Sequence, residues 1–142
     1  MTDLAQVLVE RFEGCRLKAY EDTLGKWTIG WGHLLSNEED WSGYTITQLT
    51  ADEWLQEDLG DARVLAEEFP YFPNLNEVRQ AVLTSMCFQM GGAPLRWPSF
   101  MAALEAEDYT AAAAAGRDSE WYRQTPARAE AEMTMLDIGT YQ

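Results

Sequence analysis

The strongest constraint on the fold is a long helical pattern in the middle of the chain. Apolar side chains recur there at three- and four-residue spacing, and the stripe consists of Leu55, Leu59, Ala62 and Ala66. We expect this helix to begin near Thr47 or Thr50. It should end before Pro70, because the residue before a proline resists helical geometry. A helix of about 20 residues spans roughly 30 Å, which is long enough to bridge two lobes.

The sequence before this helix contains one helix and one short hairpin. The first helix covers 3–13, with Thr2 or Asp3 as its N-cap and Gly14 as its stop. Its apolar face consists of Leu4, Val7, Leu8 and Phe12. Residues 16–35 are rich in aromatic and β-branched side chains around a turn at 22–25, which is typical of a hairpin. Residues 36–44 are polar and predict a loop.

The sequence after the long helix is mostly helical. A turn at 70–73 precedes a helix that Asn76 or Asn74 can cap and that Gly91-Gly92 ends. Its inward side chains are Val78, Ala81, Val82, Met86 and Met90. Further helices are expected over 98–107 and 108–116. A last helix should follow Thr125-Pro126, an N-cap and a first-turn proline, and stop at Gly139.

Together these patterns predict an α+β fold of the size of one domain. The 142 residues fit either one ordinary domain or two small lobes that share a core. We expect a single domain over 1–142. In it, a small lobe at about 14–46 carries the sheet, a helix at about 47–68 links the lobes, and residues 69–142 form a helical lobe with the N-terminal helix.

Charge and cysteine content exclude several classes of function. A formal net charge of −14 argues against nucleic acid and against an anionic membrane surface. Two distant cysteines, Cys15 and Cys87, and one histidine provide neither a disulfide framework nor metal-ligand spacing. We therefore expect free, buried thiols in a reducing compartment. The N-terminus lacks the features of a signal peptide, and no segment is long enough to span a membrane, so we expect a cytoplasmic origin.

Three residues near the N-terminus are candidates for chemistry. Glu13 ends the first helix, where the helix dipole disfavours a charged carboxylate and thus suits a general acid. Asp22 lies in the hairpin turn and Thr28 in the strand after it. Each has an ordinary explanation when considered singly. Together, an acid and a second carboxylate that acts on water or on the sugar are what glycoside hydrolysis needs, although the sequence does not give the carboxylate separation that decides its stereochemistry.

The spacing of these residues resembles the active-site segment of the T-even phage lysozyme family. The run from Arg11 to Leu35 has glutamate, eight residues, aspartate, five residues, threonine, then Ile-Gly-x-Gly-His. Two distant runs also match, Phe-Gln-Met-Gly at 88–91 and Trp-Tyr-Arg-Gln-Thr-Pro-Ala-Arg-Ala at 121–129. The resemblance covers nearly the whole chain in the right order.

The resemblance implies a role for each matched residue. Glu13 would be the general acid, Asp22 would orient or activate the attacking water, and Thr28 would assist that water in an inverting reaction. Arg128 is expected to pair with Glu13, which favours the charged carboxylate and opposes the effect of the helix end; the sequence does not decide between the two. Gln89 and Trp121 map to residues that line the same region.

The remaining candidates support the site or the scaffold. The resemblance implies that His33 is structural and pairs with Asp58, or failing that with Asp61. Six tryptophans suit either sugar stacking or a core. We expect one or two of the aromatic residues in the small lobe, such as Tyr20 and Trp31, to line a sugar cleft, and Trp97 and Trp121 to be core residues of the helical lobe.

The function expected from this resemblance is hydrolysis of the β-1,4 bond between N-acetylmuramic acid and N-acetylglucosamine in peptidoglycan. We expect a monomer without metal or cofactor and without membrane insertion. A holin would give it access to the wall when the host lyses, which would release it from the host cytoplasm. Three alternatives remain: a tail-associated lysozyme, a lytic transglycosylase that needs no water-binding aspartate, and an inactive peptidoglycan-binding module.

Overall fold

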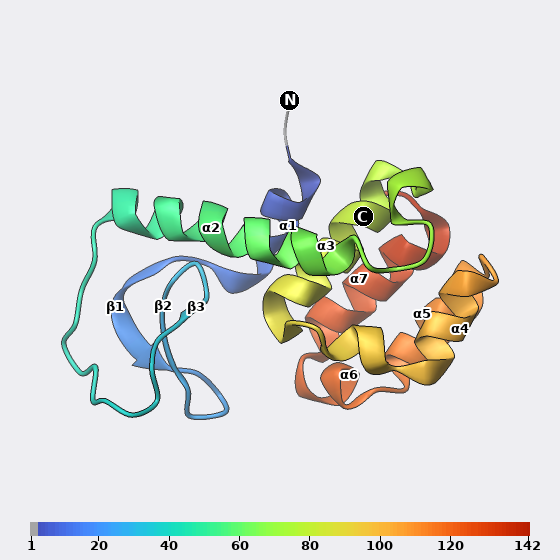
Figure 1. Ribbon diagram of the computed structural model, residues 1–142. Coiled ribbons are helices and arrows are strands. Elements are labelled where there is room, and N and C mark those ends of the chain that lie inside the picture. The colour runs from blue at the N-terminus through green and yellow to red at the C-terminus, as the bar shows by residue number, and fades with distance from the viewer. Residues whose placement is uncertain (1–2) are drawn as a thin grey trace.

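A small antiparallel sheet and a larger group of helices are joined by one long helix in the computed structural model (Figure 1). The structure describes residues 3–142. The elements in chain order are α1 (Leu4–Glu13), β1 (Arg16–Glu21), β2 (Trp27–Gly30), β3 (His33–Leu34), α2 (Gln48–Ala66), η1 (Phe72–Asn74), α3 (Glu77–Met90), η2 (Ala93–Arg96), α4 (Pro98–Glu105), α5 (Tyr109–Arg117), α6 (Glu120–Gln124) and α7 (Pro126–Ile138). The α+β architecture expected from the sequence is confirmed. Within 3–142, no helix is both long and apolar enough to cross a bilayer.

Side-chain caps decide where the longer helices begin. Asp3 accepts a hydrogen bond from the backbone N–H of Ala5, whereas Thr2 lies outside the described residues. Thr47 rather than Thr50 caps α2. Asn76 rather than Asn74 caps α3. In each case the side-chain oxygen pairs with a backbone donor that the first helical turn leaves free.

The stretch between α5 and α7 differs from the expectation. The sequence predicted no helix there, but α6 forms over five residues. Its presence changes the role of Thr125, which occupies the N-cap position of α7 without capping it through its side chain. The Thr125 hydroxyl instead donates to the Trp121 carbonyl of α6 at 3.1 Å. The expected side-chain cap was therefore wrong, because the Thr125 hydroxyl bonds back to the Trp121 carbonyl, four residues earlier, which also accepts the Thr125 backbone N–H.

The sheet has the order β1-β2-β3, with antiparallel neighbours. Its central pairing sets Tyr20 opposite Thr28, so these two side chains share one face. The loop after β3 returns along the outer edge of β1, where the Ala19 N–H donates to the Tyr44 carbonyl and the Ile46 N–H donates to the Leu17 carbonyl, both at 2.9 Å. This return covers the backbone groups that an edge strand would otherwise leave open.

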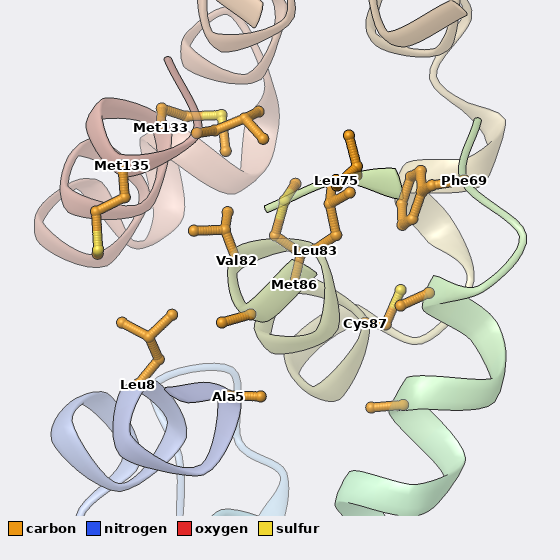
Figure 2. Close-up of a cluster of buried hydrophobic side chains, with 14 of the residues drawn as sticks. Ala5, Leu8, Phe69, Leu75, Val82, Leu83, Met86, Cys87, Met133 and Met135 are labelled. Carbon is orange, nitrogen blue, oxygen red and sulfur yellow. The ribbon is translucent and has the colours of Figure 1, made fainter. Parts of the chain in front are cut away.

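The core is built around α3, whose residues 81–87 are all buried. Figure 2 shows Val82, Leu83 and Met86 of α3 among Leu8 from α1 and Met133 from α7. Seven consecutive buried residues cover every side of a helix, so other helices must enclose it, and α1, α2 and α7 all pack on it. The apolar stripe expected for α2 is buried, and α2 also contacts β2 and β3. Thus α1 and α7 both lie against α3, and α2 connects the sheet to this core.

Both cysteines are free thiols, as expected, but only one is buried. Cys87 of α3 lies in the core, and burial raises the pKa of its thiol to about 12. Cys15 is partly exposed between α1 and β1, where the Gln48 side-chain amide lies 3.6 Å from its sulfur. The expectation that both thiols are buried was therefore wrong for Cys15, because the chain leaves the core as soon as α1 ends.

Candidate active site

The carboxylate of Glu13 is held between the two parts of the fold. Glu13 is the last residue of α1, and its side chain is 20% exposed. One oxygen, Oε2, accepts a hydrogen bond from Nη1 of Arg128 at 2.6 Å. The other, Oε1, lies against Gly32, where an added Cβ would come within 2.7 Å of it. The backbone φ of Gly32 is +74°, a conformation that favours glycine. The sequence suggested Arg128 as a partner but not Gly32.

Arg128 is buried at the start of α7, with an exposed fraction of 6%. Its Nη2 donates to the hydroxyl of Ser85 at 2.9 Å and to the Ser85 carbonyl at 3.3 Å. Its guanidinium carbon lies 5.6 Å from the centre of the Phe12 ring. These contacts from α1 and α3 fix the plane of the guanidinium, and therefore also fix the position of the Glu13 carboxylate that it binds.

A second carboxyl group lies on the other side of Arg128. Glu132, one turn further along α7, is fully buried, and the Ser85 hydroxyl lies 3.1 Å from its Oε2. Arg128 Nε lies 3.5 Å from Glu132 Oε1, an ion pair without hydrogen-bond geometry. Burial raises the pKa of Glu132 to about 7, against the lowering effects of Arg128 and Ser85. The sequence reasoning missed this residue, although its i,i+4 spacing from Arg128 places both on one helix face.

Asp22 and Thr28 lie across the β1–β2 turn from each other. Asp22 Oδ1 accepts the backbone N–H groups of Leu24 at 2.9 Å and Lys26 at 2.8 Å, which fixes the tip of the turn. Thr28 is buried, and its hydroxyl donates to the Lys26 carbonyl at 3.1 Å. A hydroxyl whose proton is already used offers only its lone pairs to a further partner.

Tyr20 lies near both carboxylates. Burial raises the pKa of its hydroxyl most, the negative charges of Glu13 and Asp22 raise it further, and Arg16 lowers it. The Arg16 guanidinium covers the Tyr20 ring at 4.3 Å. Since the charges of both Glu13 and Asp22 reach the same hydroxyl, the end of α1 and the β1–β2 turn border one region of the surface.

Glu13 opens onto a hollow of about 350 Å³ between α1, α3 and α7. The hollow is lined by Phe12, Glu13, Gln89, Thr125, Pro126, Ala127 and Arg128. Gln89 accepts a hydrogen bond from the Trp121 indole N–H at 2.8 Å. Trp121 itself is 4% exposed and belongs to the core, as expected, so it holds Gln89 rather than forming the wall. Another hollow of about 280 Å³, around Arg63 and Gln80, contains none of the candidate residues.

The remaining candidates tie the β2–β3 turn to α2. The Trp31 indole N–H donates to Asp52 Oδ1 at 2.9 Å. His33 Nδ1 lies 2.8 Å from Asp58 Oδ2, and its ring lies 4.6 Å from the Trp54 ring. The hydrogen bond to Asp58 is the main cause that raises the pKa of His33. These contacts hold the turn that places Gly32 against Glu13.

Comparison with known proteins supports a single family. Residues 10–131 match the family model described as phage lysozyme. An endolysin of Acyrthosiphon pisum secondary endosymbiont phage 1 is 30% identical over 130 residues, which cover 92% of this chain and 83% of that protein. The pre-baseplate central spike protein Gp5 of Enterobacteria phage T4 is 33% identical over 91% of this chain. Peptidoglycan hydrolase gp36 of Pseudomonas phage phiKMV is 35% identical over 85% of this chain.

The relatives differ in how much of their length is matched. The chain spans about a quarter (26%) of the spike protein and 14% of gp36, but most of the endolysin. The matched residues begin in the last turn of α1 and continue into α7, so they include both residues of the Glu13–Arg128 pair. The chain belongs to the phage lysozyme family.

Proposed function

We propose that this protein is a lysozyme-type cell-wall hydrolase, a glycoside hydrolase that cuts the β-1,4 bond between N-acetylmuramic acid and N-acetylglucosamine in peptidoglycan. The observation that carries the proposal is the Glu13 carboxylate, held by Arg128 at 2.6 Å at the edge of a hollow. The names of the endolysin and of the peptidoglycan hydrolase relatives support it. Glycoside hydrolysis uses one carboxyl group as an acid together with a second carboxylate, and in this proposal these groups are Glu13 and Asp22.

In the proposed mechanism, Glu13 is the general acid. It donates its proton to the oxygen of the leaving sugar while the bond to the anomeric carbon lengthens. Gly32 and Arg128 limit where the two carboxylate oxygens can lie. Positioning of this kind is worth a large part of the rate, because a misplacement of about 1 Å can cost roughly a hundredfold.

Asp22 and Thr28 act on the attacking water in this proposal. The Thr28 hydroxyl donates to the Lys26 carbonyl, so it accepts a proton of the water instead of donating to it. Asp22 accepts the other proton, which leaves an oxygen lone pair of the water directed at the sugar. Attack from the face opposite Glu13 inverts the anomeric centre, and the first product released is expected to be the inverted anomer.

We further propose that the enzyme is a monomer and that it takes part in host lysis, reaching the wall from the host cytoplasm through a holin. Tyr20, Trp31 and Gln89 are proposed to border the bound sugar chain, with His33 and Asp58 as scaffold. The match to a central spike protein favours one alternative, a lysozyme carried on the phage particle. Detection of the chain in purified virions would support that alternative, and its absence from them would support the lysis role.

The reaction can be tested through its products. Digestion of purified sacculi is expected to release fragments with reducing N-acetylmuramic acid ends, detected by mass spectrometry. Asp22→Asn should lower the rate at least tenfold, while the neighbouring Glu21→Gln, on an exposed side chain, should not. Anhydro ends would contradict hydrolysis, and the absence of any product with folded protein would favour a binding module.

Gly32→Ala is expected to damage activity more than stability. The new Cβ would push the flexible Glu13 carboxylate away from Arg128, and we expect kcat to fall by about tenfold or more. Gly43→Ala is a matched control, because Gly43 has a similar φ of +80° but open space around it. Both variants should lose about 1–2 kcal/mol of stability, because an L-residue is strained at a positive φ. Equal activity of the two variants would contradict the role of Gly32.

A further inference from the structure

Arg128 is shared by two carboxyl groups that approach it from opposite sides. Glu13 contacts Nη1 from the exposed side, and Glu132 faces Nε from the buried side. One guanidinium can neutralise only one carboxylate, and an extra buried charge is costly. The cluster is therefore expected to hold one proton, either on Glu13 or on Glu132.

The geometry on the buried side is prepared for a second pairing. Arg128 Nε is a buried nitrogen for which no residue of 3–142 is in position to accept a hydrogen bond. Glu132 Oε1 lies 3.5 Å away, so a small shift of an ionised carboxylate would satisfy this donor. The Ser85 hydroxyl already links the two groups, because it accepts from Arg128 Nη2 and lies 3.1 Å from Glu132 Oε2.

The charged residues of the neighbouring helices are engaged elsewhere. On α5, Arg117 pairs with Glu130 on the exposed side of α7. On α6, Arg123 pairs with Glu120. On α3, Arg79 donates to the carbonyls of residues 136 and 137 near the end of α7. The groups that act on the buried carboxyl within the described chain are thus Arg128, Ser85 and, from α1, Glu13.

We propose that Glu132 is a positioning residue that alternates with Glu13 as the ionised partner of Arg128. When Glu13 carries the proton that it needs as an acid, Glu132 is ionised and takes over the guanidinium. When Glu13 is ionised, Glu132 is protonated. Each exchange balances, because Glu132 releases one proton to solvent as Glu13 takes one up. This inference rests on the proposed function and deepens it, since it explains how an acid can keep its proton beside an arginine.

The exchange is suited to neutral pH. Burial raises the pKa of Glu132 to about 7, so both of its forms are accessible there. Glu130, two residues earlier on the same helix, is half-exposed, and hydrogen bonding to Arg117 lowers its pKa to about 2. Glu130 is therefore a matched control, a glutamate on α7 that also pairs with arginine but remains ionised throughout.

The pH profile of wall hydrolysis tests the exchange. In Glu132→Gln, Arg128 can pair only with Glu13, so the ionised form of Glu13 is stabilised relative to its protonated form. The alkaline limb of the kcat profile should move about one unit to lower pH, the rate at pH 8 should fall roughly tenfold, and the rate at pH 5 should be unchanged. Ser85→Ala should move the limb in the same direction by less, because it removes a donor from the ionised Glu132. The pH profile of Glu130→Gln should match that of wild type.

Melting curves provide a readout that does not depend on activity. A folded-state pKa raised above the ordinary value means that stability is lost as the pH rises from that ordinary value through about 7. Wild type should therefore lose melting temperature relative to Glu132→Gln between about pH 5 and pH 8, with both well folded at pH 5. A Glu132→Gln profile that matches wild type would overturn the exchange while the proposed function stands. Wild type without activity at any pH would overturn both.

Discussion

Glu13→Gln is expected to lower kcat on purified sacculi by about 10²–10⁴-fold, the usual contribution of a general acid. Glutamine has nearly the shape of glutamate and can still meet Arg128, but it has no proton to give to the leaving sugar. The loss should therefore appear in kcat and not in wall binding, as measured by turbidity clearing and by co-sedimentation with sacculi.

The control for this result is the melting temperature of the variant, which shows whether the fold is intact. The buried Arg128 loses the negative charge of its exposed partner in Glu13→Gln, but Glu132 lies 3.5 Å from its Nε and can supply a negative charge instead. We expect the melting temperature to change by only a few degrees. Glu10→Gln, one turn earlier on α1, should leave both activity and stability near wild type. If Glu13→Gln retains more than about a tenth of the activity, Glu13 is not the acid.

Arg128→Met is expected to cost about 3 kcal/mol of folding stability, at the low end for a broken buried ion pair, because Glu132 can stay protonated. For a chain of this size that corresponds to a drop of roughly 10 °C in melting temperature. Activity per folded molecule should also fall tenfold or more, since the Glu13 carboxylate loses the contact at 2.6 Å that places it. Melting is followed by circular dichroism, and activity is measured by turbidity clearing well below the melting point of the variant.

Two further variants distinguish an effect of Arg128 on folding stability from its effect on activity. Arg123→Met removes an exposed arginine whose side chain is 60% exposed, and should change stability by less than about 0.5 kcal/mol. Arg128→Met combined with Glu132→Leu removes both buried ionisable groups and should regain part of the lost stability without regaining activity. An Arg128→Met protein with normal activity per folded molecule would show that Arg128 serves the fold alone.

Local chemistry explains why much of this fold could be predicted from the sequence. The caps Thr47 and Asn76 and the stop at Gly139 each act within one helical turn, so a short stretch of sequence contains all the interacting groups. The short α6 is different, because five residues are too few to show a helical period. Its formation depends on the packing of Trp121, which is a tertiary effect.

The candidate site also contains residues that local sequence indicates and one that depends on tertiary packing. Glu13, Asp22 and Thr28 were found through their spacing, which a sequence displays directly. Glu132 was missed because its i,i+4 spacing from Arg128 indicates a shared helix face but not that this face is buried. Glu132 is buried, whereas Glu130 faces Arg117 and solvent, and only the packing of α7 against α3 decides this.

The sequence separation of Glu13 and Arg128 also limits how early the contact between them can form during synthesis. The two residues are 115 positions apart. At about 5–20 residues per second, a ribosome needs roughly 6–23 s to travel from one codon to the other. Throughout that interval the nascent α1 has no partner for its terminal carboxylate and no α3–α7 surface to pack on. The sheet and the proposed water-binding residues are made early, but the proposed hydrolytic centre can be completed only after α7 has been translated.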